Sequence, residues 1–182
     1  AKRIWDAWWT LRPKARPPIQ WQRSGSRPLN SPERRIASLC SMLSRLGENP
    51  LPSFASKLKG EGGAGRFATF AMDSLSTDDP FWNLRTSFDS PPLKRPASST
   101  GRTRALELVV DVLMPSMLAF AELNSDKTLS TEAEKAYLAL PSTAPNRAFT
   151  NAMNRWFINP EDAVKSLRDA ASRQGVLHIH SS

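Results

Sequence analysis

The sequence predicts a single, mainly α-helical domain of about six helices joined by long loops rich in proline and serine. Three observations predict this class. Apolar residues recur at three- and four-residue spacing, helix start and stop signals bracket those segments, and no alternating apolar and polar run indicates a strand. The chain has 182 residues, an ordinary size for one domain with a core of its own.

Residues 1–30 are rich in proline, tryptophan and basic side chains. Four apolar residues in this segment recur at helical spacing: Ile4, Trp5, Trp8 and Trp9. This spacing predicts a short helix that ends near Leu11. Trp21 is expected to dock the segment onto the core. Because no start methionine is present, we expect this end to be a truncation edge.

The clearest helix is predicted over residues 31–46. Asn30 or Ser31 can cap its N-terminus, Pro32 suits the first turn, and Gly47 suits the position after the last turn. Apolar residues at helical spacing form one stripe, which we expect to be buried: Ile36, Leu39, Cys40, Leu43 and Leu46.

The next part of the chain is less regular. Residues 51–59 are ambiguous, and residues 60–65 satisfy the pattern G-x-G-x-x-G. We interpret this pattern as a flexible loop, because no strand precedes it as a dinucleotide site requires. A helix is predicted over residues 66–75, and Asp78 or Asp79 can cap a turn that carries Phe81 and Trp82.

A flexible loop is predicted over residues 86–103, and a helix over residues 105–123. That helix is apolar nearly all round, which is typical of a central, buried helix. Pro115 should kink it, because the ring removes one hydrogen bond and crowds the preceding turn.

Three further helices follow. Thr131 and Glu134 form a capping-box pattern for a helix to about Leu140. Residues 145–157 predict the second, burying Phe149, Met153 and Trp156. The third is predicted to start at residues 159–162 and either to end at Gly175 or to continue through Leu177. The expected organisation is therefore a basic segment, residues 1–30, followed by a helical domain, residues 31–182.

Several short motifs match a known family, in the right order along most of the chain. They are Arg27-Pro28-Leu29-Asn30-Ser31-Pro32, Arg35-Ile36-Ala37, Phe81-Trp82, Gly101, Val109-Val110 leading to Pro115, and Arg173-Gln174-Gly175. Through them, residues from Trp21 onward resemble the C-terminal part of the bacterial domain-of-unknown-function family 2851. Asp111 departs from the pattern, since family members tend to have asparagine there.

The resemblance implies a bacterial source and a longer protein with an additional N-terminal region. It implies no activity. Whatever chemistry the family performs can reside in the region that precedes the matched part, so the resemblance favours a supporting role for this chain.

The net charge of +8 is concentrated at the N-terminus. Nine of the 25 basic residues but only two of the 17 acidic residues lie in residues 1–35. Basic side chains attract phosphates, and exposed aromatic rings stack on unpaired bases. The segment is therefore a candidate surface for nucleic acid or for an adjoining domain: Lys2, Arg3, Trp8, Trp9, Arg12, Lys14, Arg16, Trp21 and Arg23.

A second candidate site is a group of charged residues near the predicted central helix. Glu107 and Asp111 lie four residues apart, on one helical face, and repel each other unless a cation intervenes. We interpret them as part of a buried structural ion-pair network with Arg27, Arg35 and Arg104. The alternative is a metal-dependent hydrolase or nuclease centred on the two carboxylates.

Other chemical signals are weak. The one cysteine, Cys40, is predicted to be a buried apolar residue, and His178 and His180 lack further ligands for a metal. We expect no cofactor, no metal and no membrane span. A chain with one cysteine and no signal segment is expected to be cytoplasmic.

Three functions remain, in this order. The first is a non-catalytic helical domain that packs against or scaffolds the N-terminal region of a larger bacterial protein. The second is a nucleic-acid-binding module, and the third is the hydrolase or nuclease fragment. The interpretation leans against an enzyme.

Overall fold

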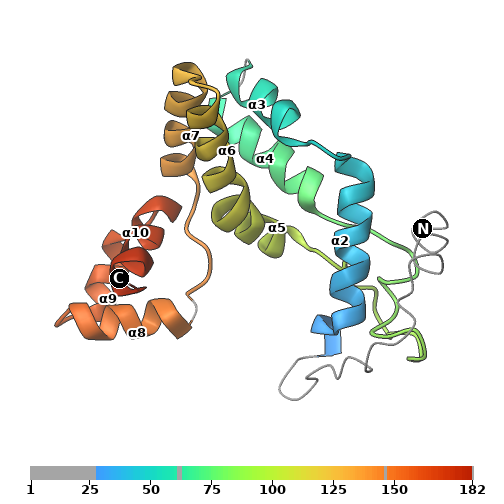
Figure 1. The fold of residues 1–182 in the computed structure, drawn as a ribbon. Helices are drawn as coiled ribbons and strands as arrows, with labels where there is room; N and C mark the ends of the chain where they lie inside the picture. Colours follow the sequence, from blue (N-terminus) through green and yellow to red (C-terminus); the bar gives the residue numbers. More distant parts are fainter. Residues whose placement is uncertain (1–27, 61–62, 146, 182) are drawn as a thin grey trace, which may run out of the picture. The chain divides into compact units, whose positions relative to one another are not determined.

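The computed structural model describes residues 28–60, 63–145 and 147–181 (Figure 1). Over these residues the fold is mainly α-helical, which confirms the predicted class. The described part contains no named strand, and an isolated bridge pairs Pro141 with Asp169. Of the predicted N-terminal segment, residues 1–30, only the last three belong to the described part.

The chain forms two compact units. Unit 1 comprises residues 1–45 and 77–99, and unit 2 comprises residues 46–76 and 100–182.

The regular part of unit 1 is a short 3-10 helix, η1 (Pro28–Asn30), followed by α2 (Pro32–Leu46). The Oγ atom of Ser31 accepts a hydrogen bond from the Arg34 N–H at 3.3 Å, and Gly47 has φ +74°. A side-chain cap at the start and a left-handed glycine at the end are the signals that the sequence contains. The bounds predicted for this helix are confirmed.

The predicted buried face of α2 is wrong. Arg34, Ser38 and Met42 are the buried residues of the helix. The predicted stripe is not buried: Ile36, Leu39 and Leu43 are exposed, and Cys40 and Leu46 are partly exposed.

The segment of residues 77–99 is the partner of this buried face and has no regular helix. Asp79 caps its first turn as predicted, since its Oδ1 accepts the N–H groups of Phe81 at 2.9 Å and Trp82 at 3.0 Å. The Leu93 N–H then donates to Leu84 at 2.6 Å, and the segment folds back on itself. A loop has backbone polar groups to satisfy, which explains why α2 turns polar side chains toward it.

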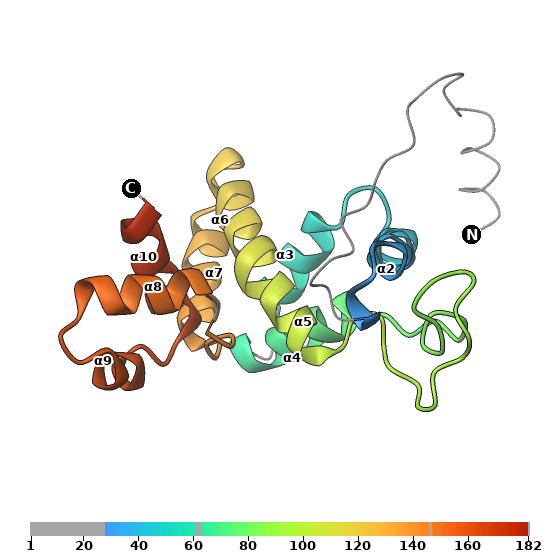
Figure 2. The ribbon, with the colours of Figure 1, turned by 90° about the horizontal axis from the view of Figure 1, so that it is seen from below.

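Unit 2 contains the remaining helices, beginning with α3 (Leu51–Lys59), α4 (Gly63–Leu75), α5 (Arg102–Leu108), α6 (Met114–Leu123) and α7 (Lys127–Ala139). Helix α7 packs against α3, α4 and α6, and α4 packs against α5 (Figure 2). The ambiguous segment 51–59 is thus helical, and α4 begins inside the predicted glycine loop. Side chains that fill this core include Phe54, Phe67, Met114, Met117 and Leu129.

A wide π-helical turn, Val109–Leu113, joins α5 to α6. The Met114 N–H donates to the Val109 carbonyl, five residues back. Pro115 has no N–H, and its ring would crowd the carbonyl of Asp111, so a wider turn before it relieves the conflict. The sequence predicts an irregularity at Pro115, and the π-helical turn lies directly before that residue. It buries one face, however, and leaves Val112 and Pro115 exposed.

Two helix starts differ from the prediction. Helix α7 begins at Lys127, because the Asp126 Oδ1 accepts the Leu129 N–H at 2.9 Å. The last predicted helix is divided into α9 (Pro160–Ser166) and α10 (Ala170–Ser181). The Asp169 Oδ1 accepts the Ser172 N–H at 2.7 Å and starts α10, which continues through Gly175.

Helix α8 (Arg147–Trp156) lies where residues 145–157 predict a helix. It buries Phe149 and Met153 as expected, but Trp156 is exposed. Helix α10 packs against both α7 and α8. Arg173 of α10 supports this contact, since it donates to the Thr143 carbonyl at 2.6 Å and lies over the Phe149 ring.

Candidate interaction surface

Arg34 is the central side chain on the inner face of α2. It is only 1% exposed, and it donates to the carbonyl oxygens of Leu29 at 3.1 Å and Ala97 at 2.5 Å. Burial lowers the pKa of this guanidinium. No carboxylate of the described residues forms a salt bridge with it, so the two carbonyls satisfy the charge.

Arg34 thus holds α2 to the loop, because Leu29 precedes the helix and Ala97 belongs to the segment of residues 77–99. Arg35 is exposed on α2, and Arg27 lies outside the described residues. Arg34 is identified by its position on the helix. It lies on the same face as Ser38 and Met42, since the three residues are spaced four apart.

Hydroxyl groups complete the inner face. Ser38 Oγ and Thr77 Oγ1 are 2.8 Å apart, and Thr77 Oγ1 is 2.8 Å from Ser99 Oγ. Ser31 Oγ donates to the carbonyl of Thr86. Buried polar groups are stable when they are hydrogen-bonded, and these hydroxyl contacts satisfy most of the polar face, although Arg34 Nε has no partner among the described residues.

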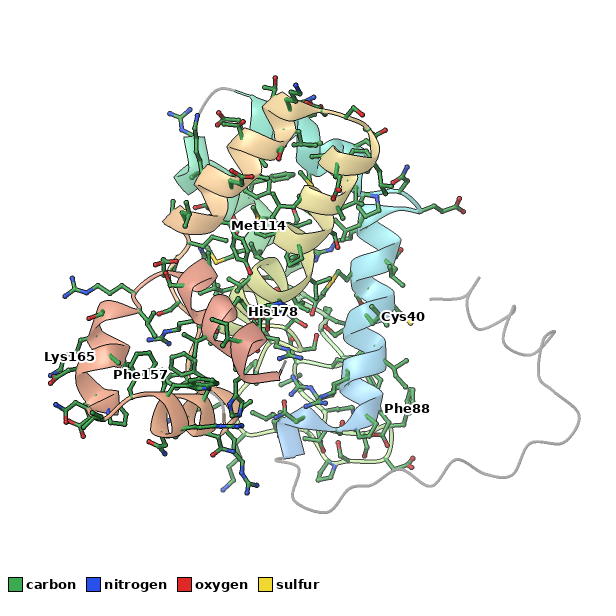
Figure 3. All side chains as sticks on the ribbon, turned by 60° about the vertical axis from the view of Figure 1, so that its left-hand side comes forward. Cys40, Phe88, Met114, Phe157, Lys165 and His178 are labelled. Carbon is green, nitrogen blue, oxygen red and sulfur yellow. The ribbon has the colours of Figure 1, made fainter. Side chains whose placement is uncertain are left out.

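The outer face of α2 is apolar. Ile36, Leu39 and Leu43, which we name the α2 stripe, are 47%, 53% and 55% exposed. They lie at positions i, i+3 and i+7, on one side of the helix. Cys40 follows Leu39 in the sequence, lies on α2 where Figure 3 labels it, and is partly exposed. Helix α2 thus buries an arginine and exposes an apolar stripe.

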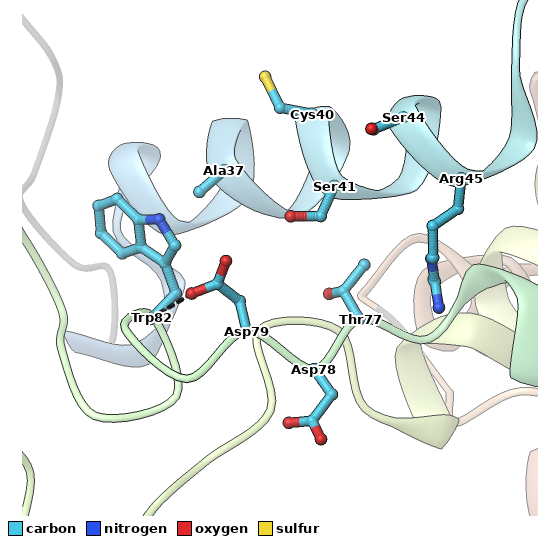
Figure 4. A pocket seen from close by; sticks show the side chains of 9 residues that line it. All are labelled: Ala37, Cys40, Ser41, Ser44, Arg45, Thr77, Asp78, Asp79 and Trp82. Carbon is cyan, nitrogen blue, oxygen red and sulfur yellow. Dashed lines mark hydrogen bonds between the residues drawn. The ribbon is translucent and has the colours of Figure 1, made fainter. Parts of the chain in front are cut away.

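A groove of about 410 Å³ lies between α2 and the turn Thr77–Trp82. Ala37, Ser41 and Arg45 point toward the turn, whereas the sulfur of Cys40 points away from it (Figure 4).

The polar groups of this groove serve local structure. Asp79 caps the turn, and Asp78 accepts a hydrogen bond from the Asn83 amide. Among the described residues, no histidine lines this groove.

An aromatic cluster lies in the loop of unit 1. The Trp82 ring centroid is 5.1 Å from that of Phe81 and 4.9 Å from that of Phe88, both at steep angles. The Arg85 guanidinium lies 5.1 Å from the Phe81 centroid. Trp82 is buried, but Phe81 and Phe88 remain exposed, which adds apolar surface to this unit.

The predicted five-residue buried ion-pair network is wrong for the described residues. Arg104 Nη1 pairs with Glu107 Oε2 at 2.5 Å, but this pair is near the surface. Asp111 instead accepts a hydrogen bond from Gln174 Nε2 at 2.5 Å. Arg35 belongs to unit 1, and Arg27 lies outside the described part. The spacing of two residues on one helix predicts whether they pair, but it does not predict partners from distant parts of the chain.

The Asp111 carboxyl has a pKa above its ordinary value, because of partial burial and then because of the Glu107 charge. The folded state thus holds this proton to higher pH than the unfolded chain does. The carboxylate therefore lowers stability as pH rises through and above its ordinary pKa, and it has no such effect below that pKa.

We expect Asp111→Asn to raise the urea midpoint of unfolding near neutral pH. The amide keeps an oxygen acceptor for Gln174 and removes the repulsion with Glu107. The gain should disappear near about pH 3, below the ordinary pKa of aspartate. Urea denaturation at both pH values measures it, and an equal gain at both would contradict the assignment.

The sequence-predicted nucleic-acid surface lies outside the described residues. This holds for all nine of its members: Lys2, Arg3, Trp8, Trp9, Arg12, Lys14, Arg16, Trp21 and Arg23.

Among the described residues, no group of three or more His, Cys, Asp or Glu side chains is placed to hold a metal ion. His178 and His180 both lie in α10. Within the same residues, no helix combines the length and the apolar character that crossing a membrane requires.

No protein-family model, curated protein or solved structure matches the chain. The resemblance to family 2851 thus stays a prediction from short motifs.

Proposed function

We propose that the chain is a non-catalytic helical module of a larger bacterial protein, and that it packs against the N-terminal region of that protein through the α2 stripe. The observation that carries this proposal is the orientation of α2. The helix directs Arg34 inward and leaves Ile36, Leu39 and Leu43 about half exposed.

The chemistry of the stripe favours a polypeptide partner. Aliphatic side chains at i, i+3 and i+7 fit the groove of a facing helix. They carry no charge for a phosphate and no aromatic ring for a base. Phe81 and Phe88 extend the apolar surface of the same unit.

A non-catalytic role is supported by the contacts of the carboxylates that were candidates for catalysis, because each of them pairs with a neighbouring group. Glu107 pairs with Arg104, Asp111 with Gln174, and Asp79 with the backbone of its own turn. These contacts weaken the case for a metal-dependent hydrolase. A single cysteine suits the reducing cytoplasm, where we place the module.

The test is association with the polypeptide that the same gene encodes ahead of Ala1, measured by isothermal titration calorimetry. We expect the triple variant Ile36→Gln, Leu39→Gln, Leu43→Gln to bind about 100-fold more weakly. Covering the exposed half of each side chain contributes about 1 kcal/mol, and about 1.4 kcal/mol corresponds to a factor of ten.

A matched control is the triple variant Val112→Gln, Leu123→Gln, Leu138→Gln, which changes three exposed apolar residues of unit 2. It should bind as the wild type does. Equal weakening by both triple variants, or no association of the wild-type chain, would exclude the α2 stripe as the contact.

Nucleic-acid binding is a second proposal, favoured by the basic charge of residues 1–35. Titration of single- and double-stranded DNA and RNA at several salt concentrations tests it. Binding through phosphate contacts must weaken steeply with salt, so binding that is absent or insensitive to salt would exclude it.

A further inference from the structure

We propose that the connection between α8 and α9 binds the surface of a lipid bilayer that contains anionic headgroups. The contact is made by Trp156, Phe157 and Ile158, which we name the α8–α9 tip. This inference goes beyond the proposed function, because the tip belongs to unit 2 and shares no residue with the α2 stripe.

The tip exposes three consecutive apolar side chains. Ile158 is 100% exposed, and Trp156 and Phe157 are 52% and 39% exposed. Figure 2 shows the connection between α8 and α9 at the edge of the unit 2 ribbon, on the side away from α3 and α4, and Figure 3 labels Phe157. The three side chains therefore present apolar surface at an edge of unit 2.

The local backbone explains why the tip is exposed. Phe149 and Met153 lie on the buried face of α8, and the helix ends at Trp156. Asn159 precedes a proline and has φ −116° and ψ 83°, so the chain leaves the helical conformation before α9 begins at Pro160. The tip thus follows the last buried residue of α8 and precedes the next helix.

Basic side chains predominate around the tip. Residues 147–168 contain four basic and two acidic side chains, all exposed, which gives a net charge of +2. The basic residues are Arg147, Arg155, Lys165 and Arg168. Of the two acidic residues, Asp162 pairs with Lys165 at 3.0 Å, and the other is Glu161. A positive surface of this kind is attracted to anionic headgroups.

The arrangement favours lipid over a polypeptide partner. Three consecutive residues at the end of a helix do not lie on one helical face, so they do not form the stripe that a facing helix accepts. Tryptophan is enriched where a membrane meets water, and exposed apolar side chains gain free energy on entering the boundary between headgroups and acyl chains.

Arg155 is placed to assist this contact. Its guanidinium lies 5.6 Å from the centroid of the Trp156 ring. A basic side chain beside an inserted ring can extend back to the headgroups, where its charge stays solvated. The contact is with the surface of the bilayer and needs no spanning helix.

The test has to be local to the tip, because the basic charge of residues 1–35 can also attract the chain to anionic vesicles. Ile158→Cys in a Cys40→Ser background gives the full chain one attachment point for a nitrobenzoxadiazole dye. Because Ile158 is wholly exposed, this substitution leaves the core unchanged.

Vesicles of phosphatidylcholine and phosphatidylglycerol, at about 2:1, should raise the fluorescence of the dye at position 158 about threefold or more, because the dye leaves water. Doxyl-labelled lipid should quench it. Leu123→Cys in the same background is the matched control, since Leu123 is 85% exposed at the end of α6 in unit 2. A dye at position 123 should remain in water.

Vesicle sedimentation of the full chain without dye supplies a second measurement. Ile158→Asp should lower the partition coefficient about tenfold, because it removes an inserted side chain and adds a charge that anionic headgroups repel. Leu123→Asp adds the same charge elsewhere in unit 2 and should bind as the wild type does.

Three results would overturn the inference. The first is a wild-type chain that does not bind the mixed vesicles. The second is binding that leaves the dye at position 158 in water, which would assign the contact to another part of the chain. The third is an equal change of fluorescence at positions 158 and 123, which would show that the tip is not the contact.

Discussion

Replacing Arg34 by alanine is expected to lower the free energy of unfolding by about 3 kcal/mol. The substitution removes the donors for the carbonyls of Leu29 and Ala97 and leaves a cavity in unit 1, because Arg34 itself is fully buried. Urea denaturation followed by far-ultraviolet circular dichroism measures the change.

The neighbouring Arg35→Ala is the control, because Arg35 has the same side chain in an exposed position on the same helix. Its effect should be within about 0.5 kcal/mol. Arg34→Lys should recover only part of the loss, since one ammonium does not reproduce the fork that reaches two carbonyls. Equal effects of Arg34→Ala and Arg35→Ala would show that the inner face of α2 is misassigned.

Leu129→Ala is expected to lower the free energy of unfolding by about 2–5 kcal/mol. Leu129 is fully buried on α7, the helix that α3, α4 and α6 pack against. The substitution leaves a cavity at this shared contact. The same denaturation experiment measures the loss.

Leu138→Ala supplies the comparison, because Leu138 lies on the same helix but is 63% exposed. It should change the free energy of unfolding by less than about 0.5 kcal/mol. A loss at Leu138 as large as that at Leu129 would mean that α7 presents a different face to its neighbours.

Local signals predicted the helices well. The bounds of α2 follow from Ser31, Pro32 and Gly47, which act within one turn of the positions they determine. The irregular turn before Pro115 likewise follows from the missing N–H and the bulk of the ring. These features depend on near neighbours, and a single sequence contains that information.

Cap signals failed where two candidates competed. Thr131 and Glu134 form a capping-box pattern, but Asp126 starts α7 because its carboxylate accepts the Leu129 N–H. Asp169 similarly divides the last predicted helix, through its hydrogen bond to Ser172. In both cases an aspartate lies directly before the first residue of the helix and accepts the N–H three residues further on.

The buried face of α2 could not be predicted from periodicity alone. An apolar stripe is expected to face the interior, but here the interior consists of a loop rich in hydroxyl and carbonyl groups. The inner face depends on residues as far away as Ala97, 63 positions from Arg34. The same long-range dependence explains why the sequence pattern predicts buried roles for Arg27 and Arg35 but not for Arg34.

The central claim is that α2 turns its polar face inward and leaves its apolar face exposed for a partner polypeptide. Hydroxyl-radical footprinting of the full chain, with mass spectrometry, measures side-chain exposure along this helix directly. In the chain by itself, Met42 should be protected and Leu39 and Leu43 should be labelled, and addition of the polypeptide encoded ahead of Ala1 should protect Leu39 and Leu43. Labelled Met42 with protected Leu39 and Leu43 in the chain by itself would contradict the claim.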